Sequence, residues 1–517
     1  MVQPATISVC FGRIRGTVLA CAVLLAGCGG ASGVTTYAVH ATVSGLAGSG
    51  LTLQLNAAND LAVTVNGNFT FTAPVNSGMS YQVTVTTQPS SPQQVCTVSN
   101  GSGTIGTSGA TVTVRCATVI TTLYSFTGGG GVAGSIDGAS PNGSLVQGSD
   151  GSLYGTTSQG GAGVGTCSTV GCGTVFKITL SGEETVLHSF GVTAGDGSSP
   201  VTGLVLGSDG NFYGPTPYGT GTITPTLYQI TATGAESVIY LFALVEGVDD
   251  FPMVSDVIQA HDGLLYGADY ESPADGASRY VIYGITTTGT RVFTADIGPD
   301  LSRQTLLVQT SDGSLYGTTN LGGAYGMGSV FQAKPAVKTV YSFGGVSGDA
   351  TEPGSPMIQG SDGNLYGTSA TGGRPSATCP KGCGTVFRVT LSGVETVLYS
   401  FGSTSVDGQG PSGALVEASD GNFYGTTASG GSKASGGSGA ASCAANVNSG
   451  YSGCGTIYKI TPTGIATVLY SFGSAPGDGA VPTGALLQAS DGNLYGTTSA
   501  GGAQNQGTVF KLALGAR

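Results

Sequence analysis

The chain has 517 residues, of which only 9% are charged, and its formal net charge is −12. An acidic chain with so few basic residues is not expected to bind nucleic acid, because the phosphate backbone repels negative charge. Hydrophobic residues make up 39% of the chain, and they alternate with Thr, Ser and Gly in short runs. This pattern excludes a disordered chain and is typical of β-strands, so we expect an all-β protein.

The first 27 residues have the pattern of a bacterial lipoprotein signal peptide. Two arginines precede an apolar run at 18–26, which is too short to span a bilayer as a permanent helix. The run ends in Leu-Ala-Gly-Cys, which resembles a lipobox and implies acylation of Cys28. The next residue is Gly29 rather than an inner-membrane retention aspartate, so the resemblance implies an exported protein held at the outer membrane or cell surface. The alternative is an ordinary signal peptide with a chance cysteine.

Eight cysteines remain in the expected mature chain, and they are close in sequence two by two. An even set of local pairs is typical of disulfides formed in an oxidising compartment. A zinc site needs four converging ligands, so these separated pairs and the scarcity of histidine give no metal site. The predicted disulfides are Cys96–Cys116, Cys167–Cys172, Cys379–Cys383 and Cys443–Cys454.

A turn motif that recurs seven times organises most of the chain. Each copy contains Asp-Gly and ends in Tyr-Gly, and successive copies are 50 to 71 residues apart. Asp-Gly is a tight hairpin signal, and each unit is interpreted as four short strands. The repeated aspartate is interpreted as a turn former rather than a catalytic group. The aspartates are Asp150, Asp209, Asp262, Asp312, Asp362, Asp420 and Asp491.

The two ends of the repeat region predict a closed ring. The last unit stops after its third strand, at 507–512, whereas a lone strand at 120–126 precedes the first unit. Together these fragments complete one sheet, so we predict a seven-bladed β-propeller over 118–517 rather than an open solenoid. Residues 35–117 do not follow the repeat and are predicted to form a small immunoglobulin-like β-sandwich. Residues 28–34 would then tether this domain to the lipid.

The repeat resembles a known bacterial family. The segments GTVFKIT at 173–179, ETVLHSF, and GLVLGSDGNFYG at 203–214 are similar to the GloVer-type tandem repeat of choice-of-anchor surface proteins. The resemblance extends over about residues 118–514 and implies export and surface attachment, here as a lipoprotein. It supplies no catalytic residue.

The third unit departs most from the repeat and contains the candidate binding residues. It lacks the Thr-Thr and Gly-Gly of its neighbours, and its loops are expected to lie on the same face as the inter-unit loops. Clustered oxygen ligands can bind Ca²⁺, but a solvated acidic loop is the favoured interpretation, because no EF-hand or RTX-like spacing is present. No cofactor is therefore predicted. The residues are Asp249, Asp250, Asp269, Tyr270, Glu271 and Asp275.

No catalytic signature emerges, since His40, His188 and His261 suggest no Ser-His-Asp arrangement. The first interpretation is therefore a non-enzymatic, monomeric surface platform that binds a glycan or a protein and contacts the membrane through its lipid. The alternatives are an extracellular hydrolase or lyase acting on a polysaccharide or lactone, and a structural or adhesive envelope component. Glycoside hydrolysis would need two carboxylates at a set separation, which the sequence does not show.

The lipid anchor is tested by Cys28→Ser. Loss of the acylated thiol should release the protein from the membrane fraction, because the acyl chains provide the apolar surface that holds it there. Fractionation followed by immunoblotting measures the distribution. Inhibition of lipoprotein signal peptidase with globomycin is an independent control, and an unchanged membrane fraction in both experiments would contradict the anchor.

Overall fold

The computed structural model describes residues 34–46, 50–89, 94–118, 120–128, 137–162, 171–193, 195–219, 225–242, 256–271, 279–298, 305–376, 379–404, 407–431 and 453–514. Every strand and turn in these ranges belongs to an all-β fold, without a helix. No helix in the described part of the chain is therefore long and apolar enough to cross a membrane.

The N-terminal unit is built from two four-stranded sheets that share one core. The sheet orders are β5-β2-β10-β8 and β4-β3-β7-β9, and a short β1-β6 pair accompanies them. Ala41 and Leu53, one from each sheet, are fully buried in this core. The strands are β1 (Thr36–Tyr37), β2 (Val39–Ser44), β3 (Leu51–Leu55), β4 (Asn59–Val63), β5 (Gly67–Thr70), β6 (Val75–Asn76), β7 (Ser80–Thr87), β8 (Gln94–Ser99), β9 (Ser102–Thr104) and β10 (Ala110–Thr118).

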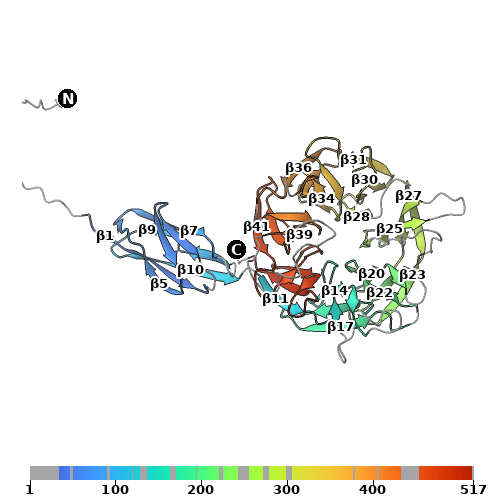
Figure 1. The fold of residues 1–517 in the computed structure, drawn as a ribbon, viewed down its shortest axis with the longest axis horizontal. Coiled ribbons are helices and arrows are strands. Elements are labelled where there is room, and N and C mark those ends of the chain that lie inside the picture. The colour runs from blue at the N-terminus through green and yellow to red at the C-terminus, as the bar shows by residue number, and fades with distance from the viewer. Residues whose placement is uncertain are drawn as a thin grey trace, which may run out of the picture.

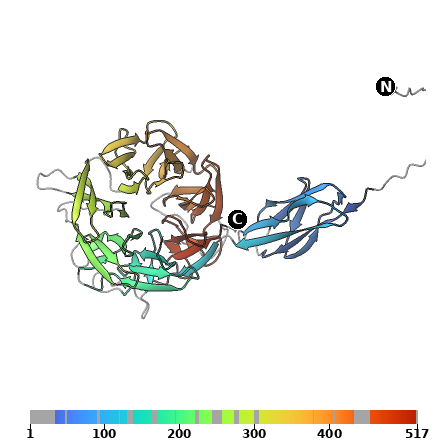
Figure 2. The ribbon, with the colours of Figure 1, turned by 180° about the vertical axis from the view of Figure 1, so that it is seen from behind.

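The remaining strands form a ring of sheets (Figures 1 and 2). Among the described residues from 120 onward, seven sheets of four or five strands follow one another, and we number them first to seventh ring sheet. In Figure 1 the strands β14, β20, β25 and β39 lie nearer the ring centre, and β17, β23, β27, β31, β36 and β41 lie at the rim.

The first ring sheet contains β13 (Val146–Gln147), β14 (Leu153–Thr157), β16 (Thr174–Ile178) and β17 (Glu184–Ser189). The second contains β19 (Val205–Leu206), β20 (Phe212–Thr216), β22 (Thr226–Ile230) and β23 (Glu236–Leu241). The third contains β24 (Ile258–Gln259), β25 (Leu265–Glu271), β26 (Arg279–Ile285) and β27 (Arg291–Gly298). The fourth contains β28 (Thr305–Gln309), β29 (Leu315–Thr319), β30 (Ser329–Lys334) and β31 (Lys338–Ser342).

The fifth ring sheet contains β32 (Ala350–Pro353), β33 (Ile358–Gln359), β34 (Leu365–Gly372), β35 (Thr385–Val389) and β36 (Glu395–Ser400). The sixth contains β37 (Gly408–Pro411), β38 (Val416–Glu417), β39 (Phe423–Gly430), β40 (Thr456–Ile460) and β41 (Ala466–Ser471). The seventh contains β43 (Leu487–Gln488), β44 (Leu494–Thr498), β46 (Thr508–Leu512) and β11 (Ile120–Ser125). Short pairs join β12 (Gly138–Ala139) to β15 (Gln159–Gly160), β18 (Gly197–Ser198) to β21 (Tyr218–Gly219), and β42 (Gly479–Ala480) to β45 (Ala500–Gly501).

The seventh ring sheet combines strands from both ends of the repeat region. β11 pairs antiparallel with β46, with Ile120 opposite Leu512, which confirms the predicted pairing of the lone strand with the last unit. Phe126 follows β11 and is fully buried. Its ring packs edge-on against Phe176 of the first ring sheet, with 5.1 Å between centroids. The closing strand therefore also contributes to the core between the seventh and first ring sheets.

The repeated Asp-Gly turn holds each inner hairpin together. In the first unit the Asp150 carboxylate accepts hydrogen bonds from Ser152 N at 3.1 Å and from the Tyr154 hydroxyl at 2.9 Å. Gly151 has a φ of +80°, which an L-residue with a side chain rarely adopts. The structure thus confirms that the repeated aspartate forms the turn, as the Asx-type interaction predicts.

Phe126→Ala tests how much the closing strand contributes to stability. Removing a fully buried phenylalanine should lower the free energy of unfolding by about 3–5 kcal/mol, through lost burial and the cavity left behind. Urea unfolding followed by circular dichroism measures the change. Ile465→Ala is the control, because Ile465 is 68% exposed, and it should stay within about 0.5 kcal/mol. Equal losses in the two variants would contradict the closing role.

Candidate functional site

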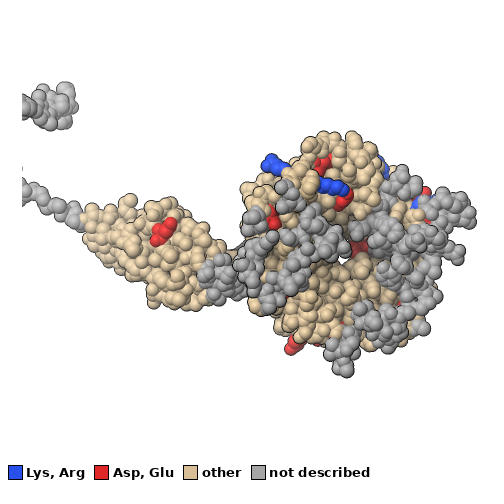
Figure 3. Space-filling model, in the orientation of Figure 1, with Lys and Arg blue, Asp and Glu red and all other residues tan. Residues whose placement is uncertain are grey.

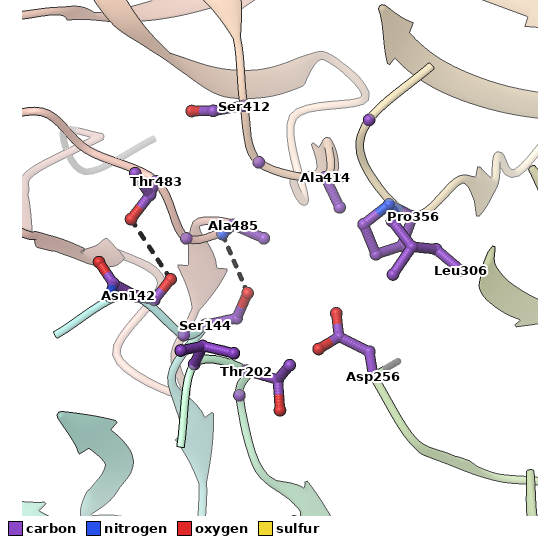
Figure 4. Close-up of a pocket in the computed structure, with 16 residues that line it drawn as sticks. Asn142, Ser144, Thr202, Asp256, Leu306, Pro356, Ser412, Ala414, Thr483 and Ala485 are labelled. Carbon is purple, nitrogen blue, oxygen red and sulfur yellow. Dashed lines mark hydrogen bonds between the residues drawn. The ribbon is translucent and has the colours of Figure 1, made fainter. Parts of the chain in front are cut away.

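A cavity of about 340 Å³ lies on the axis of the ring. All seven ring sheets contribute to its wall through the residues at or just before their innermost strands (Figure 4). One residue from each sheet illustrates the arrangement: Ser144, Gly203, Asp256, Leu306, Pro356, Ala414 and Ala485. Each of these stands two positions before the residue that pairs with the repeated tyrosine of the inner hairpin, so the repeat itself places them around the axis.

Small residues allow seven chain segments to converge at the axis. A Cβ atom at Gly143 would lie 2.5 Å from Thr202 O, and one at Gly484 would lie 2.7 Å from Gly143 O. Such distances leave no room for a side chain, so glycine permits the close approach. Ala485 N donates a hydrogen bond of 2.9 Å to Ser144 Oγ across the junction of the last and first sheets. The wall consequently combines backbone and hydroxyl groups with small and apolar side chains.

Asp256 is the exception in this wall of small and apolar residues. Among the described residues that line the cavity, it carries the only carboxylate. Figure 4 shows that its carboxyl points into the cavity, on the side where Thr202 lies. Burial raises the pKa of Asp256 from 3.8 to about 6, while the Thr202 side chain acts in the lowering direction. A carboxyl with this pKa exchanges its proton close to neutral pH, which suits a general acid or base.

The sequence analysis did not single out Asp256, although it chose other acids of the same unit. The signal was present, because the equivalent positions of the other units hold Ser, Gly, Leu, Pro or Ala. An aspartate at one such position breaks the repeat. The predicted acids lie in or near the loops of the third unit, whereas Asp256 stands just before the inner strand β24.

Three of the predicted binding residues, Asp269, Tyr270 and Glu271, lie at the C-terminal end of β25. Asp269 is 3% exposed, and Arg291 Nη1 lies 3.8 Å from its Oδ2 and 2.7 Å from Glu271 Oε1. Burial raises the pKa of Asp269 to about 7 in spite of Arg291. The Tyr270 ring contacts Tyr280, with 4.8 Å between centroids.

An arginine therefore faces both described acids of this group of candidate binding residues. Their negative charge is balanced within the protein rather than offered to a cation. The other three predicted residues, Asp249, Asp250 and Asp275, lie outside the described residues. The binding role of the whole group stays a prediction.

The inter-unit loops, which the sequence analysis assigned to the binding face, contain buried aspartates with a structural role. Asp407 is 4% exposed and accepts hydrogen bonds from the Tyr399 hydroxyl at 2.8 Å and from Gly408 N at 2.9 Å. Asp349 accepts equivalent bonds from Tyr341 and Gly344 N, at 3.0 and 2.7 Å. These aspartates fasten each loop to the rim strand of the preceding sheet.

A glutamate of the following sheet adds a second buried carboxyl to some of these junctions. Burial and the charge of Asp349 raise the pKa of Glu395 from 4.5 to about 7. Burial and the charge of Asp137 raise the pKa of Glu184 to the same value. Both residues lie at the first position of a rim strand, away from the axial cavity. Their shifted pKa values therefore reflect packing between sheets.

The disulfides follow the predicted local pairs where the structure describes them. Cys96 and Cys116 are bonded across the neighbouring strands β8 and β10 of one sheet, and Cys379 is bonded to Cys383. Cys172 and Cys454 are also disulfide-bonded, but their predicted partners, Cys167 and Cys443, lie outside the described residues. Bonds of this kind are consistent with an exported protein. The predicted lipidation site, Cys28, also lies outside the described residues.

Charged side chains are sparse and scattered over the described part of the face in Figure 3. The uncharged surface predominates around the ring. A neutral, polar ligand fits such a surface better than a highly charged polymer does.

Comparison with known proteins gives one family and a set of solved structures. The family model of the Gloeobacter/Verrucomicrobia repeat matches residues 36–283 and 255–440. No curated protein matches the chain. The periplasmic gluconolactonase of Pseudomonas aeruginosa is 15% identical, with a TM-score of 0.39, and the match covers 72% of this chain and 96% of that chain.

Two further solved structures are similar at the same low level. The GH93 α-L-arabinofuranosidase of Fusarium graminearum, solved with arabinobiose, is 11% identical, with a TM-score of 0.37 and coverage of 59% and 92%. A Thermus thermophilus protein described as an oxidoreductase (glucose dehydrogenase) is 14% identical, with a TM-score of 0.34 and coverage of 60% and 95%. The first interpretation, a non-enzymatic binding platform, is contradicted by this comparison, because the matching structures carry the names of enzymes.

The buried glutamates predict a pH dependence of stability. The pKa of Glu395 is about 7 in the folded chain and 4.5 when unperturbed, so the folded state binds the proton more tightly. The stabilisation is complete below about pH 4.5 and is lost as the pH rises through 7. Glu395→Gln should therefore raise the free energy of unfolding at pH 8 and change it little at pH 5.

Urea unfolding at both pH values measures the difference between variant and wild type. Glu183→Gln is the matched control, because Glu183 is exposed, and it should have little effect at either pH. A Glu395→Gln effect that is the same at pH 5 and pH 8 would contradict the assignment.

Proposed function

This chain belongs to the Gloeobacter/Verrucomicrobia repeat family, and from the geometry of its axial cavity we propose that it is an enzyme that hydrolyses a small carbohydrate lactone. The observation that carries the proposal is Asp256, a carboxyl with a pKa of about 6 in a wall of small residues and backbone. A cavity of about 340 Å³ is within the size range of small-molecule sites and is suited to one sugar ring.

Asp256 acts first as a general base. Its carboxylate removes a proton from a water molecule while the water oxygen attacks the lactone carbonyl carbon. The resulting tetrahedral intermediate collapses as the ring C–O bond breaks. The carboxylic acid of Asp256 then returns the proton to the departing ring oxygen, so the residue ends the cycle ionised. A pKa of about 6 allows both steps near neutral pH.

The cavity wall supplies polar groups for orientation and for the developing negative charge. Ser144 accepts a hydrogen bond from Ala485 N and donates none to another residue in the described ranges, so its hydroxyl hydrogen is available to a substrate. Thr202 stands beside Asp256 (Figure 4). Hydroxyl donors placed at a carbonyl oxygen stabilise the oxyanion in acyl transfer.

A single carboxylate favours a lactone over a polysaccharide as the substrate. Glycoside hydrolysis commonly uses two carboxyl groups, about 5 to 10 Å apart, on opposite sides of the bond that breaks. The described lining of the cavity offers one, Asp256. Opening a lactone needs one group that first accepts and then returns a proton.

The ring is proposed to be a seven-bladed β-propeller, and the N-terminal unit an immunoglobulin-like sandwich. The ring assignment is supported by the succession of seven ring sheets and by the β11–β46 pairing. The sandwich assignment is supported by two four-stranded sheets around one core. Its Cys96–Cys116 bond lies within one sheet, unlike the inter-sheet bond of antibody domains.

The protein is proposed to be located at the outer membrane or cell surface, where a lipid attached to Cys28 would anchor it. The Leu-Ala-Gly-Cys sequence supports acylation, and the disulfides support an oxidising compartment. The N-terminal unit then separates the ring from the membrane. An enzyme at this location would act on lactones outside the cytoplasm, as a monomer.

Asp256→Asn tests the proposed reaction. The purified chain is supplied with glucono-1,5-lactone and a panel of other aldonolactones, and acid release is followed at constant pH. Loss of the proton-transferring group should lower kcat/KM roughly 10²–10⁴-fold. In the wild type, kcat/KM should rise with pH around pH 6, because the ionised carboxylate is the active form.

Asp60→Asn is the matched control, because Asp60 is an exposed aspartate of the N-terminal unit. Its kcat/KM should equal that of the wild type. Unchanged turnover in Asp256→Asn, or no turnover of any lactone by the wild type, would contradict the proposal.

A further inference from the structure

Three potential metal ligands meet at the junction between the first and second ring sheets. His188 lies in β17, Glu236 begins β23, and Asp196 lies in the loop between the two sheets. One ligand atom from each residue lies within 4.8 Å of the other two. His188 Nε2 is 3.2 Å from Asp196 Oδ2 and 3.4 Å from Oδ1.

Other junctions of the ring have the same geometry with different chemistry. Tyr341, Asp349 and Glu395 occupy the equivalent positions between the fourth and fifth ring sheets, as the shared register of the rim strands shows. There the Tyr341 hydroxyl donates to Asp349 at 3.0 Å. A phenol hydroxyl can donate a hydrogen bond, and here the carboxylate of Asp349 accepts it.

His188 replaces that tyrosine and brings a different capacity. A neutral imidazole has a nitrogen lone pair, which binds a transition metal. One imidazole nitrogen with two carboxylate oxygens is a ligand set that suits Zn²⁺, with the fourth position left to water. Calcium prefers sites made entirely of oxygen. The residue types therefore favour zinc at this junction.

The burial of the three side chains favours a bound cation. The Asp196 side chain is 1% exposed and the His188 side chain 16%. Glu236 Oε1 is buried and has no hydrogen-bond partner among the described residues. A buried polar atom without a hydrogen-bond partner is costly. A divalent cation bound between the three side chains would give Glu236 Oε1 a partner.

The surrounding contacts hold two of the ligands in place. Gly191 N donates to Asp196 Oδ2 at 3.0 Å. The His188 ring packs edge-on against Phe190, with 4.8 Å between centroids. Contacts of this kind orient ligands before a metal arrives and increase affinity. The partial exposure of His188 leaves a route for the ion to enter.

We propose that His188, Asp196 and Glu236 bind one zinc ion, which joins the first ring sheet to the second. The site is separate from the axial cavity, since none of its three residues lines that cavity. Its role is to fasten two neighbouring sheets at the rim. The Cys pairs are not part of it, because Cys172, the described cysteine of the first unit, is disulfide-bonded.

His188→Tyr is the first test, made on the full chain without a histidine tag and after treatment with a chelator. Titration of the wild type with zinc chloride in a calorimeter should give one site per chain. The variant should bind zinc at least about tenfold more weakly. It should still fold, because tyrosine fills the same position at other junctions, such as Tyr341. Zinc should raise the melting temperature of the wild type and leave that of the variant unchanged.

Tyr341→His in the His188→Tyr chain is the matched gain-of-function variant. It places an imidazole beside Asp349 and Glu395 and should restore one zinc site per chain. Cobalt(II) absorption provides a readout of ligand geometry, and its visible bands should disappear in His188→Tyr and return in the double variant. Absence of zinc binding by the wild type, or equal affinity in His188→Tyr, would overturn the proposal.

Discussion

The pairing of β11 with β46 is the interaction on which the rest of the ring depends. It places a strand from before the first unit at the rim of the last sheet, so both ends of the repeat region are held in one sheet. The hydrogen bond from Ala485 N to Ser144 Oγ joins the last and first sheets near the axis. Once the ring closes, the innermost strands of all sheets begin around one point. The axial cavity is a consequence of that closure, because no single unit could form its wall.

Burial acts on carboxyl groups in two different settings. At the rim, Asp407 accepts hydrogen bonds from a tyrosine and from backbone amides, so its polar atoms are satisfied within the protein. At the axis, burial raises the pKa of Asp256 to about 6 while its carboxyl still points into a cavity. The first arrangement stabilises loops, and the second provides a proton-transferring group. Hydrogen-bond donors of the protein lie beside the Asp407 carboxyl, whereas the axial cavity lies beside that of Asp256.

Because the units repeat, equivalent positions recur where neighbouring ring sheets meet. The side chains at these positions differ from one pair of sheets to the next. Tyr341 donates a hydrogen bond at one junction, whereas His188 presents a ring nitrogen at another. In the third ring sheet Arg291 begins the rim strand, where Glu184 and Glu395 stand in others, and it pairs with Asp269 and Glu271. A single substitution in a repeated frame therefore changes a hydrogen-bonded junction into an ion pair or a candidate metal site.

The amino-acid sequence is enough to predict the all-β fold, the repeat, the turn aspartates and the completion of the last sheet by residues 120–126. These predictions follow from local signals, namely the alternation of apolar and polar residues and the Asp-Gly turns. The strand missing from the last unit is matched by the extra strand before the first. The folded arrangement is needed to tell which acids face a cavity, which accept hydrogen bonds and which lie beside an arginine. The sequence shows that Asp256 differs from the residues at the equivalent positions of the other units. It does not show that Asp256 faces a cavity, Asp269 an arginine and Asp407 a tyrosine hydroxyl. The distinction arises from packing between sheets that are far apart in the chain, which sets burial, partners and hence the chemistry of each carboxyl.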